Sequence, residues 1–290
     1  MWNAEGAWGI WKGTNCTFVH SILHSTITSF ARSFLSALFA LPDPGLSLAS
    51  ATSGLDTYAG GLDILNSPYP LSSLLVAVSA AAVAGTILAP LDMARTKLIL
   101  TPCTHLPRSI ISTLKSLPQW TLPISIAPTT ILHSALPTFI STSTPLVLRS
   151  KLGIDPVLTP NIYSIATFCS QAVDLGLRIP LETVLRRGQL ALARGDTKAK
   201  LFDVVVDAGP YKGLFGTMRS IVYEEGEREV TLTKGEKGRE GAKATKVGQQ
   251  RRRGQGTEGL YRGWRVGMWG LVGVWGAATL GGIGAKGGEF

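Results

Sequence analysis

The sequence predicts an all-α fold, a polytopic bundle of transmembrane helices. Only 16% of the 290 residues are charged, whereas a typical soluble domain has about 25%, and the mean hydropathy is +0.22. A helix of roughly 20 residues crosses a bilayer core of about 30 Å. Stretches near or above that length, without Asp, Glu, Lys or Arg, are residues 13–31, 64–91, 116–148, 156–173 and 266–285. Their number favours a membrane protein over a soluble protein with a large core.

Prolines and composition divide the chain into expected elements. Pro42 and Pro44 end the first helix, and the Gly/Ser/Pro-rich residues 42–68 after it are expected to form a linker. Short amphipathic helices are expected within 107–118 and at 212–225. The long helices are expected at residues 14–41, 71–100, 124–152, 161–194 and 264–285.

The segment 227–258 is rich in Lys and Arg and has almost no apolar residues. Such a segment buries too little surface to offset its ordering entropy, so a disordered basic insertion is predicted. Its Arg251–Arg253 run could suit nucleic acid or anionic lipid. We favour a solvated loop, with anionic lipid headgroups as the next partner because the neighbouring segments are membrane helices, and we expect no nucleic acid.

Residues that could support catalysis or metal binding are sparse. Cys16, Cys103 and Cys169 are scattered and odd in number, which argues against a disulfide framework and a CxxC metal site. Cys16, His20 and His24 share one helix face but lack a fourth ligand. No Ser-His-acid set or nucleotide-binding Gly loop occurs in the sequence. We therefore expect no metal, no cofactor and no enzymatic activity.

Asp174 and Arg178 are four residues apart in the fourth expected span. Ionisable side chains within a membrane segment suggest a functional role unless they satisfy one another. Both interpretations remain open: a self-satisfied intramembrane pair, or a remnant of a polar cavity.

Two kinds of internal repeat lie at the ends of the apolar spans. The first is Pro-Leu, then an acid, then bases three to seven residues on; its copies comprise Pro90, Asp92, Arg95, Lys97 and Pro180, Glu182, Arg187, Gln189. The second is acid-Gly followed by aromatic-base-Gly; its copies comprise Glu5, Gly6, Trp11, Lys12, Gly13 and, across the basic insertion, Gly226, Tyr261, Arg262, Gly263. Two motifs repeated in the same order indicate a repeat architecture.

These motifs resemble the signatures of the mitochondrial carrier family. The resemblance implies pseudo-threefold repeats of about a hundred residues, each with two transmembrane helices and a short surface helix between them. It assigns 1–41 to a remnant of the first repeat (the loop motif and one span), 69–152 to the second repeat and 156–290 to the third. A carrier has six spans and the sequence shows five, so the first odd helix is expected to be missing and the chain to be N-terminally truncated.

The resemblance also implies a role for the Pro-acid-base motif. The proline kinks the odd helix, and the acid of one odd helix pairs with a base of the next to form a latch. Ions beside an apolar region are costly unless they are paired, and a pair that opens is how an alternating-access carrier would use the latch.

Departures from the carrier pattern bear on function. Leu185 stands where the second copy needs a base, and Ile99 stands where the first copy would have Gln. We expect Glu182 to find Arg186 within its own helix instead, which would leave the transport gate eroded.

An eroded carrier with a linker and a long insertion resembles the divergent fungal Ugo-type branch of the mitochondrial outer membrane. That resemblance implies an adaptor in mitochondrial fusion, a multi-pass outer-membrane location, and dynamin-like GTPases of the outer and inner membranes as partners. The alternative is a genuine solute carrier that exchanges metabolites across the inner membrane.

Overall fold

The computed structural model describes residues 11–41, 69–102, 109–117, 121–154, 158–196, 209–233 and 247–286. The predicted linker 42–68 lies outside this part, as do Glu5, Gly6 and Cys103. The long helices are α2 (Thr14–Leu38), α4 (Pro70–Leu100), α6 (Ala127–Leu152), α7 (Pro160–Asp196) and α10 (Trp264–Lys286). The short helices are α5 (Ile110–Lys115), α8 (Gly213–Tyr223) and α9 (Thr257–Leu260). Each long helix falls where the sequence predicts one, and the order long, short, long occurs in both 69–152 and 156–290.

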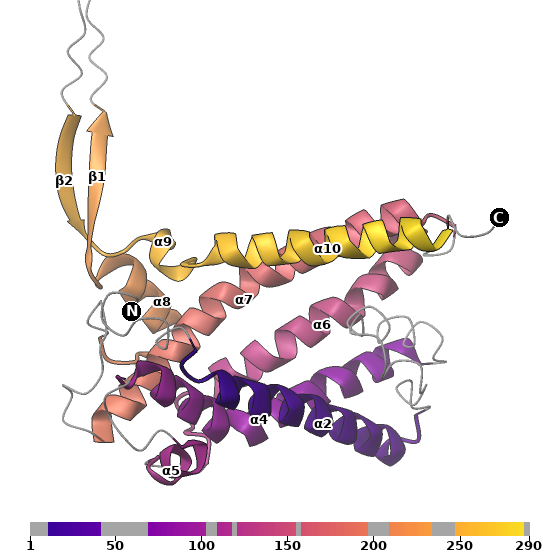
Figure 1. Ribbon diagram of the computed structural model, residues 1–290, viewed down its shortest axis with the longest axis horizontal. Helices are drawn as coiled ribbons and strands as arrows, with labels where there is room; N and C mark the ends of the chain where they lie inside the picture. Colours follow the sequence, from indigo (N-terminus) through magenta and orange to yellow (C-terminus); the bar gives the residue numbers. More distant parts are fainter. Residues whose placement is uncertain are drawn as a thin grey trace, which may run out of the picture.

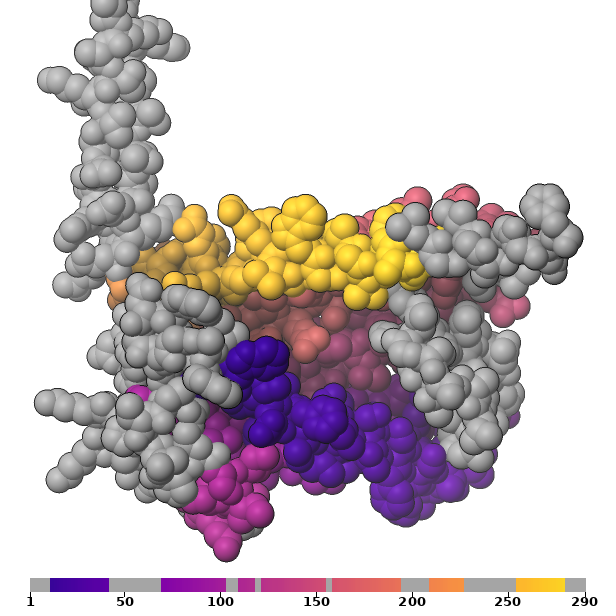
Figure 2. Space-filling view, viewed as in Figure 1, coloured from indigo at the N-terminus to yellow at the C-terminus, as the bar shows by residue number. Residues whose placement is uncertain are grey.

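The long helices pack side by side in chain order (Figure 1). α2 packs against α4, α4 against α6, α6 against α7, and α7 against α10. Within the described residues, no extensive contact joins the two outer members of this row, α2 and α10. The space-filling view shows a hollow between them, at the bottom of which α6 and α7 are visible (Figure 2). The described helices therefore form a row with a gap between its two outer members.

The prolines inside the long helices do not end them. Pro90 lies within α4, Pro180 within α7, and Pro137 and Pro145 within α6. In the turns before Pro145, Thr142 Oγ1 donates to the Thr138 oxygen and Thr144 Oγ1 to that of Ile140. Prolines are tolerated in membrane helices where neighbouring helices and side chains satisfy the carbonyl that each proline frees.

The bundle buries small side chains and exposes large apolar ones. Ala80 and Ala84 of α4 are fully buried, whereas Phe30, Leu71 and Val266 are 71%, 71% and 78% exposed. A soluble protein rarely exposes so many large apolar side chains along its helices, while small residues at helix interfaces are typical of membrane bundles. By length and hydropathy, two helices of the described part, α4 and α6, could cross a membrane.

The prediction that residues 227–258 form a disordered insertion is partly wrong. Strands β1 (Glu227–Thr233) and β2 (Val247–Arg253) pair as an antiparallel ladder, with Glu227 opposite Arg253 and Thr233 opposite Val247. In Figure 1 this hairpin projects from the end of the bundle that carries α8 and α9. The sequence VTL of β1 favours a strand, and a ladder satisfies backbone groups without a hydrophobic core. The fold is thus helical with one two-stranded sheet.

Gly85 allows α4 and α6 to approach closely. A Cβ atom built on Gly85 would lie 2.4 Å from Ser134 Oγ and 2.6 Å from Ser134 Cβ. The Ser134 Cβ position is fixed by the backbone of α6, so rotating the hydroxyl would not relieve the clash.

We predict that Gly85→Ala destabilises the bundle by about 1–3 kcal/mol, the typical cost of overpacking. The matched control is Gly176→Ala in α7, where nothing lies within 4 Å of an added Cβ and Ala should be neutral or stabilising. Chemical unfolding in detergent micelles measures both, and equal unfolding free energies for the two variants would contradict the packing described.

Candidate functional site

The two proline motifs meet at the interface of α4 and α7. Arg186 Nη1 of α7 donates to both carboxylate oxygens of Asp92 in α4, at 2.9 Å to Oδ1 and 2.8 Å to Oδ2. The same nitrogen lies 2.9 Å from Thr96 Oγ1 and 3.0 Å from Gln189 Oε1. Gln189 Nε2 donates to Asp92 Oδ2 at 2.7 Å. We call Asp92, Thr96, Arg186 and Gln189 the latch cluster.

The latch cluster is shielded from solvent. The side chain of Asp92 is 14% exposed and that of Arg186 is 26% exposed, while Thr96 and Gln189 are buried. Thr96 Oγ1 and Gln189 Oε1 lie 2.6 Å apart, which closes the set of hydrogen bonds across the two helices. Charges so placed are stable only when paired and hydrogen-bonded, and here each charged group has several polar partners.

The cation of this cluster is not the one that the repeat pattern predicts. Arg187 pairs with Glu225 Oε2 at 3.3 Å instead, and so ties α7 to the end of α8. Leu185, at the position expected for a base, is buried, with 1% of its surface exposed. The base lies one residue farther along, at Arg186, and it reaches Asp92, the acid of the other copy of the motif. Asp92 therefore has a partner in the second copy although Leu185 occupies the position expected for the base.

The predicted pair within α7 is present, but it is secondary. Arg186 Nη2 lies 3.5 Å from Glu182 Oε1, and the Glu182 side chain is 42% exposed. Helical spacing could have identified the cluster, because Glu182, Arg186 and Gln189 are at i, i+4 and i+7 and therefore share one face. Arg187 is five residues from Glu182 and faces away from it.

The other cations of the first copy serve local roles. Arg95 Nη1 lies 3.7 Å from Asp92 Oδ1, one turn away in α4. Lys97 Nζ donates to the main-chain oxygen of Ser116 at 3.0 Å and to its Oγ at 3.1 Å, which anchors the end of α5 to α4. At the opposite side of the cluster, Thr183 Oγ1 donates to the Leu260 oxygen and ties α9 to α7.

The aromatic-base-Gly motif ends in the same backbone conformation in both copies. Gly13 has φ 72° directly before α2, and Gly263 has φ 90° directly before α10. Only glycine adopts this left-handed region readily. Trp11 is 67% exposed, and Gly13 packs on α4, since an added Cβ would lie 2.9 Å from Ile99.

The acid-Gly part of the second copy is also in place. Glu225, 7% exposed, accepts from the Gly209 amide at 3.3 Å in addition to pairing with Arg187. Beside it, Lys212 Nζ donates to Glu224 Oε2 at 2.9 Å. This hydrogen bond and one from Ser220 lower the pKa of the exposed Glu224 carboxyl.

The predicted intramembrane pair is not formed. In the described part of the chain, no salt bridge or hydrogen bond joins Asp174 to Arg178, and Asp174 Oδ1 is buried without a hydrogen-bond partner. The Cys16 thiol contacts the Leu91 oxygen at 3.8 Å, and the His20 and His24 rings stack with centroids 5.9 Å apart. No group of three metal-ligating side chains occurs among the residues described.

We predict that Asp92→Asn destabilises the bundle by about 2–4 kcal/mol, because it leaves the Arg186 charge shielded from water and unpaired. The control, Glu182→Gln, removes a more exposed and longer contact and should cost under about 1 kcal/mol. Denaturant unfolding of the detergent-solubilised chain measures both. If Glu182→Gln proved as costly as Asp92→Asn, the latch cluster would not be the main ionic contact between α4 and α7.

Comparison with known proteins gives one distant relationship. No protein-family profile and no solved structure matches the chain. The chain is 25% identical over 241 residues to the mitochondrial fusion and transport protein UGO1 of Saccharomyces cerevisiae, an alignment that covers 76% of this chain and 45% of that protein. The chain thus spans about half the length of the curated relative that it matches. It is a distant, Ugo-type relative of that fusion and transport protein.

Proposed function

We propose that the chain is a membrane scaffold that serves mitochondrial fusion. In this proposal it resides in the mitochondrial outer membrane with several spans, and it acts as an adaptor between dynamin-like GTPases of the outer and inner membranes. The relationship to a mitochondrial fusion and transport protein supports the process. The large apolar side chains exposed along the long helices support embedding in a bilayer. The proposal assigns no catalytic step to the chain.

The observation that carries the scaffold role is the completeness of the latch cluster. Alternating access requires a gate that both opens and closes. Separating Asp92 from Arg186 would break the ion pair and strip both groups of their shared partners Thr96 and Gln189. The desolvation penalty of a buried ion is several kcal/mol. A contact of this kind suits a permanent clamp better than a gate.

The arrangement of the helices is compatible with a scaffold. α2 and α10, the outer members of the row of described helices, make no extensive contact with one another and so offer extended helix faces to partner proteins. The projecting β1–β2 hairpin, whose β2 strand contains Arg251–Arg253, gives the scaffold a basic extension that could meet anionic headgroups outside the bilayer.

A genuine solute carrier is the second candidate. A cleft of about 800 Å³ lies between α4, α7 and the α9–α10 segment, with arginines in its lining. A cavity of this size could hold a small anionic metabolite, and the name of the yeast relative includes transport.

Two assays separate these functions. We expect the chain, reconstituted into liposomes, to exchange no labelled nucleotide or carboxylate above protein-free vesicles. We expect cells that lack it to show fragmented mitochondria, rescued by the wild-type gene and by Glu182→Gln but not by Asp92→Asn. Rapid exchange of a metabolite, or a normal mitochondrial network in the deletion strain, would contradict the scaffold proposal.

A further inference from the structure

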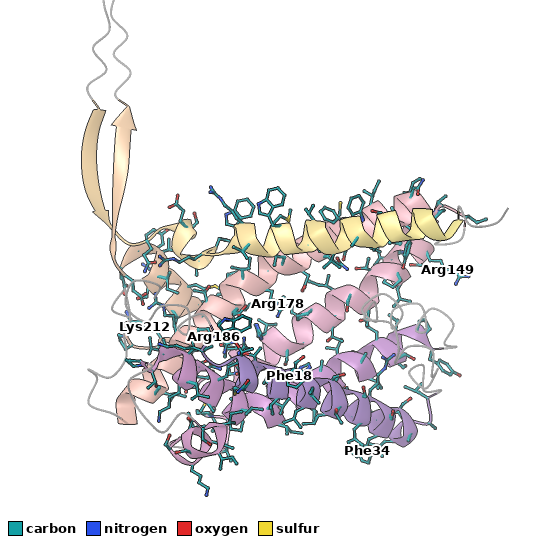
Figure 3. The ribbon with its side chains drawn as sticks, in the orientation of Figure 1. Phe18, Phe34, Arg149, Arg178, Arg186 and Lys212 are labelled. Atoms are coloured by element: carbon teal, nitrogen blue, oxygen red, sulfur yellow. The ribbon has the colours of Figure 1, made fainter. Side chains whose placement is uncertain are left out.

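The β1–β2 hairpin stands on a fixed base. Directly below its strands, the Gly254 amide donates to the Gly226 carbonyl at 2.9 Å, and Gly254 lies so close to α8 that an added Cβ would clash with the Val222 oxygen. Lys212, at the same end of the bundle (Figure 3), holds the end of α8 through its hydrogen bond to Glu224 at 2.9 Å. The hairpin is therefore anchored to α8 at the point where it leaves the bundle.

Both long edges of the hairpin are without a neighbouring strand. Among the residues described, neither strand makes an extensive contact with any element other than its partner, and the pair projects away from the helices (Figure 1). A two-stranded ribbon is marginally stable by itself. Its edges present rows of N–H and C=O groups that can pair with another extended chain.

The register shows which backbone groups point outward. Gly226 and Gly254 continue the register in which Glu227 lies opposite Arg253, and the two glycines are hydrogen-bonded. In an antiparallel ladder, bonded pairs alternate with pairs whose N–H and C=O groups point away from the partner strand. The outward groups are thus those of Val247, Gln249, Arg251 and Arg253 on β2, and of Glu227, Glu229, Thr231 and Thr233 on β1.

The two edges differ in charge. The sequence of β2, VGQQRRR, has three arginines and no acid, whereas that of β1, EREVTLT, has two glutamates and one arginine. Arg252 lies opposite Arg228 in the register, and like charges directly opposite one another destabilise a ladder. An acidic strand beside β2 would neutralise this surplus, whereas beside β1 it would meet two glutamates of its own sign.

We propose that the β2 edge accepts an acidic, extended segment of a partner protein as a third strand, an inference that rests on the scaffold role proposed above. The outward N–H and C=O groups of Gln249 and Arg251 bond to the backbone of the added strand, and the positive charge of β2 selects an acidic sequence. A lipid headgroup would neutralise the arginines but would leave the edge unpaired. A protein segment is therefore the better occupant.

The test is fluorescence anisotropy with the detergent-solubilised full chain and a labelled synthetic peptide of about eight residues, a typical strand length, in which Glu alternates with Val. We expect the wild type to bind this peptide and not the same peptide with Lys in place of Glu. Gln249→Pro removes one outward amide at an edge position, where proline is tolerated. It should weaken peptide binding about tenfold, as expected for the loss of one hydrogen bond.

The matched control is Thr231→Pro, at the register partner of Gln249 on the β1 edge, which should leave the affinity unchanged. Arg252→Gln removes one of two opposed like charges and no backbone group, and should weaken binding about threefold at low salt. Hydrogen exchange gives an independent readout, because the peptide should slow exchange of the Gln249 and Arg251 amides and not that of Thr231. Protection of the inward Gln250 amide confirms that the hairpin is intact in each variant.

Absence of peptide binding to the wild type, or an equal loss in Thr231→Pro and Gln249→Pro, would overturn the proposal. Binding of phosphatidylglycerol vesicles in place of the peptide would also overturn it, since the arginines would then serve lipid and not a strand. Peptide binding is measured without mitochondria. A normal mitochondrial network in the deletion strain would therefore reject the fusion role while leaving the β2 binding edge in place.

Discussion

The ion pair between Asp92 and Arg186 is the interaction on which the arrangement of α4 and α7 depends. It joins side chains 94 residues apart in sequence from two helices that otherwise contact one another much less than their neighbours in the row do. α6 lies between them in chain order and packs against both. The pair therefore joins α4 and α7 directly at one end of the row.

Secondary contacts extend outward from this clamp. Arg187, the next residue along α7, holds Glu225 at the end of α8, and Thr183 holds the Leu260 carbonyl of α9. Val184, Ile221 and Leu260 form an apolar cluster beneath these polar contacts. Farther along α7, Trp275 of α10 donates to Ser164 at 3.0 Å. α7 thus positions α8, α9 and α10.

Much of the fold was predictable because charge-free windows and prolines are strong signals in a membrane-like sequence. The five long helices follow from them, whereas a contact between the two proline motifs was implied only by the resemblance to the carrier family. The cation of the latch was missed because the repeat pattern was followed residue by residue, whereas helical spacing places Arg186, not Arg187, on the same face as Glu182 and Gln189. The hairpin was missed because low hydrophobicity predicts disorder, while backbone pairing needs little apolar surface. The lack of a hydrogen bond or salt bridge between Asp174 and Arg178 was not predicted, because such a contact depends on side-chain direction, which spacing in sequence does not determine.

The central claim, that the latch cluster is a permanent clamp, is tested most directly by a distance measurement across it. The native cysteines are replaced by serine, and spin labels are attached at Leu100→Cys in α4 and Ala191→Cys in α7. Pulsed electron paramagnetic resonance in nanodiscs then measures the distance between the two labels. The clamp predicts one narrow distance distribution in the otherwise unaltered chain, and a broad one when Asp92→Asn is added. Two well-separated distance populations in the unaltered chain would show that the contact opens as a gate and would contradict the account.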